Sequence, residues 1–86
     1  MGELSMLPNI GKEVELQLNK VGIKSLKELQ ELGSKQAWMY IKNIDDSACI
    51  QRLYAIEGAI RGIKKSELPK NVKEDLKEFY NYVSNK

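Results

Sequence analysis

The chemistry that this sequence offers most clearly is the binding of a phosphate by a tight turn at the start of a helix. The turn lies within Leu7–Lys12, where Ile10 stands between Asn9 and Gly11, two residue types that tolerate unusual backbone angles. Backbone N–H groups from Asn9 to Lys12 would point outward at the positive end of the helix dipole and form an anion site. Lys12 would add a positive charge. The alternative is a purely structural helix start with Ile10 packed in the core.

The composition excludes most enzyme chemistry. The chain has no histidine and a single cysteine, Cys49. This removes the commonest general base, the commonest zinc ligand and the nucleophile pairs that depend on histidine. Asp45 and Asp46 lack further ligands nearby, and helix capping explains them better than a metal does. We therefore expect no catalytic residue, metal, cofactor or small-molecule substrate, and predict that the protein is not an enzyme.

Basic side chains could support phosphate binding at two further places. Lys35 is expected to add to a basic rim near the turn. The densest basic cluster follows the long central helix and is a second candidate phosphate site; it consists of Arg61, Lys64 and Lys65. Both sets have a simpler explanation, because lysines interleaved with glutamates form a solvated surface and cations favour the C-terminal end of a helix.

The elements that must position these residues are five helices, since the apolar residues recur with helical period and show no sustained alternation. The expected ranges are 11–21, 25–32, 35–42, 47–61 and a last helix that begins after Pro69. Ser25 with Glu28 three residues later predicts a capping box, and Asp45, Asp46 or Ser47 is expected to cap the fourth helix. Short helices joined by tight glycine turns predict a compact all-α, five-helix domain.

Several side chains have expected positions in the packing of these helices. Trp38 and Phe79 lie on apolar stripes and are expected in the core. Cys49 is in phase with Leu53, which predicts a small buried side chain. Glycine inside a helix costs about 1 kcal/mol relative to alanine, so Gly58 indicates the close approach of another helix. A helix of this chain, such as the last one, is favoured over a second subunit.

The whole chain reads as one soluble domain, because 86 residues are too few for two. No apolar run approaches the roughly 20 residues that span a bilayer, and no basic-then-apolar leader begins the sequence. We therefore expect a cytoplasmic protein with no membrane partner. The net charge is only +2, so any contact with DNA must come from local geometry rather than bulk charge.

The turn resembles the helix-hairpin-helix of DNA repair and recombination proteins. The resemblance rests on Leu-Pro-Asn-Ile-Gly-Lys at 7–12 and Gly-Ile-Lys-Ser-Leu-Lys-Glu-Leu at 22–29. In that motif the usual form is Gly-hydrophobic-Gly, and the hairpin amides hold one backbone phosphate without reading bases. Asn9 stands where the first glycine is expected and can adopt the same positive φ. The segment before the turn is too short for a full first helix.

A longer set of segments resembles the C-terminal domain of the TfoX/Sxy competence regulators. The match runs in order from Leu7 to about Tyr80 and is most specific over 52–63, Arg-Leu-Tyr-Ala-Ile-Glu-Gly-Ala-Ile-Arg-Gly-Ile. The resemblance implies a single helix-hairpin-helix or SAM-like domain over 1–86 and a link to the regulation of DNA-uptake genes. In the full-length family a separate N-terminal domain precedes this one.

Two functions remain open at this point. The first is a regulatory module that contacts DNA phosphates through five residues: Asn9, Ile10, Gly11, Lys12 and Lys35. The second is a protein-interaction adaptor with a SAM-like surface, which would bind a regulatory protein or a second copy of itself and no nucleic acid. The charge around the turn separates them, because a clamp requires Lys12 to be unpaired, whereas Glu13 and Glu15 are close in sequence.

Overall fold

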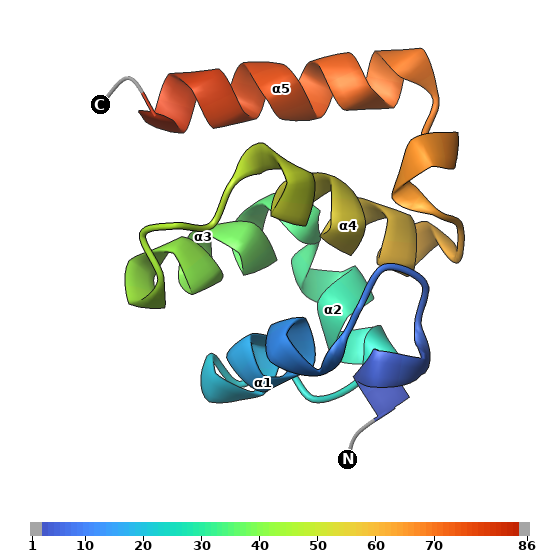
Figure 1. Ribbon diagram of the computed structural model, residues 1–86, viewed down its shortest axis with the longest axis vertical. Helices are drawn as coiled ribbons and strands as arrows, with labels where there is room; N and C mark the ends of the chain where they lie inside the picture. Colours follow the sequence, from blue (N-terminus) through green and yellow to red (C-terminus); the bar gives the residue numbers. More distant parts are fainter. Residues whose placement is uncertain (1–2, 85–86) are drawn as a thin grey trace.

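The computed structural model describes residues 3–84, which form helices joined by turns (Figure 1). The α-helices are α1 (Lys12–Lys20), α2 (Leu26–Leu32), α3 (Ser34–Ile44), α4 (Ile50–Arg61) and α5 (Lys70–Ser84), with two 3-10 turns, η1 (Glu3–Met6) and η2 (Lys65–Glu67). The described residues include no strand, and the all-α, five-helix expectation is confirmed. The expected domain over 1–86 includes four terminal residues that lie outside the described part. Within the described part, no helix is long and apolar enough to cross a membrane.

The core is built around Trp38 on α3, which is fully buried as expected. Its indole N–H donates to the Cys49 carbonyl at 3.1 Å. Two rings of α5 meet the indole at their edges, Phe79 at 6.1 Å and Tyr80 at 5.6 Å between centroids. Phe79 is half-buried against the core rather than enclosed in it. Because α5 packs through these rings, it lies across the top of α3 and α4 in Figure 1.

The predicted capping box at the start of α2 is confirmed in its first half. The Ser25 hydroxyl accepts from the Glu28 N–H at 3.1 Å. The Glu28 carboxylate accepts from the N–H of Lys24, one residue before the cap, at 2.8 Å. Two backbone donors at the helix start are therefore satisfied, although the second is one position earlier than the motif predicts.

The start of α4 differs from the expectation. The helix begins at Ile50 rather than Ser47, and its N-cap is Cys49. Asp45 does not cap it, because its carboxylate accepts from the N–H and the hydroxyl of Ser47 and closes a local turn. Cys49 is exposed, which corrects its predicted burial. Periodicity places a side chain only within a helix, and the N-cap residue precedes the first turn.

Candidate functional site

The turn before α1 is fixed by the side chain of Asn9. Its backbone has φ 69°, the left-handed conformation expected of it. Its amide group donates to the Ile63 carbonyl at 3.0 Å and to the Ala55 carbonyl at 3.4 Å. Its amide oxygen accepts from the Lys65 N–H at 3.0 Å. Figure 1 shows the result, the loop before α1 passing beside the C-terminal end of α4.

Gly58 makes this contact possible. A Cβ at Gly58 would lie 2.5 Å from the Asn9 amide nitrogen and 2.8 Å from the Ile63 carbonyl oxygen. The close approach predicted from the sequence is therefore real, but the partner is wrong. The neighbours are the Asn9 loop and the turn after α4, and not the last helix.

The four residues of the predicted clamp have different roles in the structure. Asn9 directs its side chain inward, Ile10 is buried, and the Ile10 N–H donates to the Leu7 carbonyl at 3.3 Å. Gly11 is the N-cap of α1 with an ordinary extended backbone, φ −96°, and no side chain caps the helix. Gly11 and Lys12 are exposed. The amides that remain for an external anion are therefore those of the first turn of α1, from Gly11 onward.

Glu15 was expected on a solvated surface beside Lys12 and is instead buried at 4% exposure. Its carboxylate accepts from the Ser5 N–H at 3.2 Å and so holds η1 against α1. Glu13 is the exposed acid next to Lys12.

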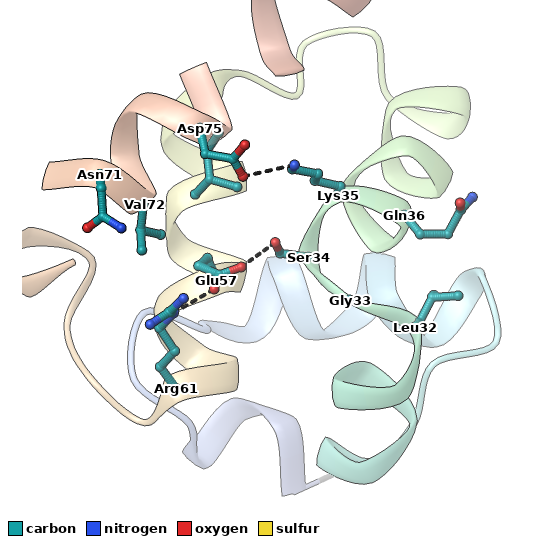
Figure 2. A pocket seen from close by; sticks show the side chains of 11 residues that line it. Leu32, Gly33, Ser34, Lys35, Gln36, Glu57, Arg61, Asn71, Val72 and Asp75 are labelled. Carbon is teal, nitrogen blue, oxygen red and sulfur yellow. Dashed lines mark hydrogen bonds and ion pairs between the residues drawn. The ribbon is translucent and has the colours of Figure 1, made fainter. Parts of the chain in front are cut away.

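The second predicted basic cluster divides between two places. Lys64 and Lys65 are exposed at the turn after α4, beside the Asn9 loop. Arg61 is bound to Glu57 through an ion pair of 2.6 Å and lines a groove beside α5 (Figure 2). The ion pairs among the described residues are Lys35–Asp75, Arg52–Asp45 and Arg61–Glu57.

The Asn9 contacts bring the turn before α1 next to the turn after α4. We call the exposed residues of these two turns the hairpin surface and define it as Gly11, Lys12, Lys64 and Lys65. The residues that Asn9 joins are 46 to 56 positions from it in sequence. Within the described part of the chain, none of the three lysines takes part in an ion pair.

Lys35 does not belong to the hairpin surface. Its ammonium group pairs with Asp75 of α5 at 2.9 Å and lies 5.6 Å from the centre of the Phe79 ring. It borders a groove of about 560 Å³ between the start of α3, α4 and α5. In that groove Glu57 pairs with Arg61 and also accepts from the Ser34 hydroxyl. Lys35 and Arg61 are therefore both matched by carboxylates (Figure 2).

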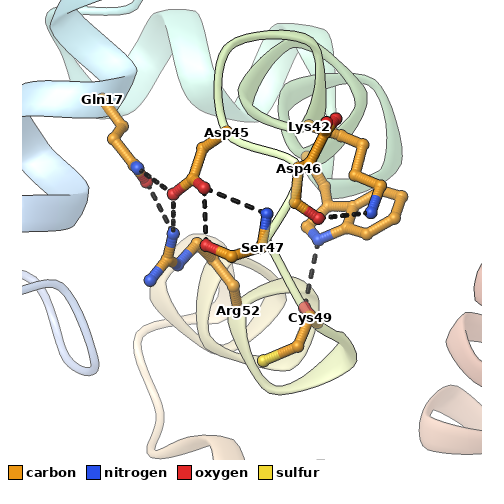
Figure 3. A network of polar contacts seen from close by, with 8 residues as sticks. Gln17, Lys42, Asp45, Asp46, Ser47, Cys49 and Arg52 are labelled. Carbon is orange, nitrogen blue, oxygen red and sulfur yellow. Dashed lines mark hydrogen bonds and ion pairs between the residues drawn. The ribbon is translucent and has the colours of Figure 1, made fainter.

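A polar network surrounds the turn between α3 and α4 (Figure 3). Gln17 of α1 donates to Asp45 at 2.7 Å and accepts from Arg52 of α4 at 2.8 Å, and Arg52 lies 3.3 Å from Asp45. The hydrogen bond from the Ser47 hydroxyl, followed by that from Gln17, lowers the pKa of Asp45 to about 2. The network joins α1, the turn after α3 and α4.

Cys49 lies beside this network at the start of α4. Partial burial raises the pKa of its thiol, but the N–H groups of Arg52 and Gln51 and the charge of Arg52 outweigh that effect, so the pKa is lowered. No group of three or more potential metal ligands occurs among the described residues.

Comparison with known proteins places the chain in a family. Residues 1–80 match the TfoX C-terminal domain. The chain belongs to the TfoX C-terminal domain family. Protein Sxy of Escherichia coli K12 is 34% identical over 76 residues, which cover 88% of this chain and 36% of Sxy.

Two crystal structures from Listeria monocytogenes share the fold of this TfoX-family chain. One is an uncharacterized protein in a triclinic form, 46% identical, with a TM-score of 0.93 over 94% of this chain and 92% of the other. The second is a protein of unknown function in a tetragonal form, also 46% identical, with a TM-score of 0.91 over 94% and 99% of the two chains.

Sequence reasoning missed the pairing of the hairpin with the turn after α4. Two signals for it were present, an asparagine where the motif has glycine and a glycine inside a helix. Asn9 had a local explanation in its positive φ, Gly58 predicted another helix as its neighbour, and nothing in the sequence paired residues 9 and 58.

Proposed function

We propose that this TfoX-family domain is a regulatory module that contacts the phosphate backbone of duplex DNA through the hairpin surface. The observation that supports the proposal most is the Asn9 contact, which joins the uncapped start of α1 to the turn carrying Lys64 and Lys65. One phosphate at the α1 amides would then lie near the turn that carries two further cations.

The mechanism follows from the groups on that surface. The first-turn amides of α1 and the charge of Lys12 would hold one phosphate, as helix N-termini do. Lys64 and Lys65 would neutralise its neighbours. Contacts of this kind fix position on the duplex and carry no base information. Few cations take part and Glu13 opposes them, so the affinity is expected to be weak and sensitive to salt.

The proposal includes the biological role that the family resemblance implies. The domain would serve the regulation of DNA-uptake genes, with DNA or a regulatory protein as its partner in the cytoplasm. It assigns the domain no catalytic step. Because the chain spans 36% of Sxy, the activity of that whole protein is not carried over.

Fluorescence anisotropy with labelled duplex DNA tests the proposal. Three phosphate contacts predict that the affinity falls about 40-fold between about 50 and 200 mM salt, from a slope near −0.9 per contact. The variant Lys12→Gln should lower that fall to about 12-fold, because one contact is lost. Lys77→Gln, an exposed lysine on α5, is the matched control and should leave the slope unchanged.

A different result favours the adaptor. Absence of binding at about 100 µM protein, beyond ordinary non-specific affinity, would refute the DNA proposal. Equal loss in the Lys12→Gln and Lys77→Gln variants would refute the assignment to the hairpin surface. The protein-interaction adaptor without nucleic-acid binding would then be the better account. The observation that favours it is that the exposed residues of α3 are all uncharged, namely Gln36, Tyr40, Asn43 and Ile44.

A further inference from the structure

The outward face of α3 carries no charge. Every residue of this helix is described, and its exposed positions are Gln36, Tyr40, Asn43 and Ile44. They follow the spacing i, i+4, i+7, i+8 and so form one ridge along the helix. The exposed residues of α1, α2 and α5 all include charges, as expected for a chain in which 30% of residues are charged.

Two hollows lie beside this ridge. One, of about 420 Å³, is lined by Val21, Tyr40, Asn43 and Ile44. The other, of about 320 Å³, shares Val21 and Tyr40 with it and continues toward α2. Tyr40 is 38% exposed and Ile44 is 51% exposed. The face therefore offers both projecting apolar side chains and the depressions that could receive them.

These features are typical of a helix-packing surface. Residues four apart form the ridges by which one helix packs into the grooves of another. Charged residues are depleted and aromatic residues enriched at the centres of interfaces, with polar residues at the rim. Glu28 and Glu31, which line the smaller hollow on its α2 side, provide such a rim.

The absence of charge favours a second copy of this chain as the occupant. In a two-fold contact the residues near the axis meet their own copies, so a charge there would face a like charge. The ridge of Gln36, Tyr40, Asn43 and Ile44 avoids this repulsion. Because ridge and hollows lie on the same face, each copy supplies both halves of the contact.

We propose that the α3 face pairs with the same face of a second copy to form a two-fold dimer. The pairing does not depend on DNA. It would also deepen the proposed function, because two linked hairpin surfaces on one duplex bind more tightly than either alone. The contact is confined to one short helix and its surroundings, so the dimer is expected to be weak, at the low end of specific interfaces.

Sedimentation without DNA tests the pairing and keeps its failure separate from that of DNA binding. The weight-average mass should rise from 9.8 kDa toward twice that value between about 10 and 500 µM, where weak contacts assemble. Ile44→Lys should weaken the dimer at least tenfold, as loss of an interface anchor of about 1.4 kcal/mol does.

Leu16→Lys is the matched control, since Leu16 is also helical and 59% exposed but lies on α1. It should change the dimer constant by about twofold or less, as surface substitutions do. A wild-type chain that stays monomeric over the whole range overturns the proposal. Equal weakening by both variants, or growth to species larger than a dimer, overturns it as well.

Asn43→Lys provides a second test that removes no apolar contact. The two added charges near the axis should repel each other, so the dimer should weaken at low salt. It should recover as salt is added, because at 0.1 M charges are screened over a distance of about 10 Å. A dimer constant for this variant that equals the wild-type value at every salt concentration would contradict the two-fold arrangement. Circular dichroism melts check that each variant folds.

Discussion

At the scale of single residues, Asn9 does more than its place in the turn requires. Its left-handed backbone allows the turn, and its side chain satisfies two carbonyls and one N–H at the end of α4. Glycine would allow the same backbone but make none of these bonds. We therefore regard Asn9 as the residue that positions the hairpin surface, not as a phosphate ligand through its side chain.

Substitutions of Asn9 should separate its two roles. Asn9→Gly keeps the backbone conformation and loses three hydrogen bonds, two of them partly buried, so it should destabilise the fold by about 2 kcal/mol. Asn9→Ala should cost about 1 kcal/mol more, because alanine disfavours positive φ. Urea unfolding measures both. Wild-type stability in Asn9→Gly would contradict the positioning role.

Gly58→Ala gives the companion measurement in the same series. Alanine normally stabilises a helix interior by about 1 kcal/mol relative to glycine, but here its Cβ would meet Asn9 and the Ile63 carbonyl, so we expect destabilisation. The penalty should shrink in the Asn9→Gly background, because one of the two clashes is removed. Additive effects would show that residues 9 and 58 are not coupled.

At the scale of elements, Asp45 stands at a junction of α1, the turn after α3, and α4. The folded pKa of about 2 lies below the ordinary 3.8. Its contribution to stability is therefore fully present above about pH 4 and is lost as the pH falls toward 2.

The variant Asp45→Asn tests this contribution. It should show a smaller loss of unfolding free energy than the wild type between about pH 4.5 and 2.5, because the group that must be protonated is gone. Asp46→Asn is the control and should follow the wild type. Asp46 is the next residue, and the bonds to Gln17 and Arg52 in Figure 3 are made by Asp45. Identical pH dependence in Asp45→Asn and wild type would contradict the assignment.

The elements are also the scale at which the sequence was most informative. Periodicity and glycine turns located all five helices, and for α2 and α3 the expected ends lie within two residues of the observed ones. The predicted start of α4 was wrong because Asp45, Asp46 and Ser47 are all favourable N-cap residues. The sequence pattern alone does not show which of their side chains bonds within its own loop instead of capping the helix. Cys49 was misplaced for the same reason.

The candidate site was predictable only in part. The turn, its positive φ at Asn9 and the basic residues Lys12, Lys64 and Lys65 could be found in the sequence. Their assembly into one surface could not, because it depends on hydrogen bonds between residues 46 to 56 positions apart. Lys35 was assigned to the wrong neighbourhood because nearness in sequence to the turn did not indicate the Asp75 partner on α5.

At the scale of the whole molecule, the basic and acidic residues nearly balance, with 14 of one kind and 12 of the other. The net charge is +2, and the cations of the groove between α3, α4 and α5 are paired. The hairpin surface keeps three lysines without ion pairs among the described residues. A small net charge with a few cations grouped beside free helix amides supports a weak, salt-sensitive contact with a polyanion.

The most direct test of this central claim is a titration of isotope-labelled protein with duplex DNA, followed by backbone amide NMR shifts. The largest changes are predicted at Gly11, Lys12, Lys64 and Lys65, with small changes at Lys35 and Arg61 in the groove. They should diminish as salt is raised. Shifts centred on the groove, or no shifts at about 100 µM protein, where non-specific binding is normally seen, would contradict the account.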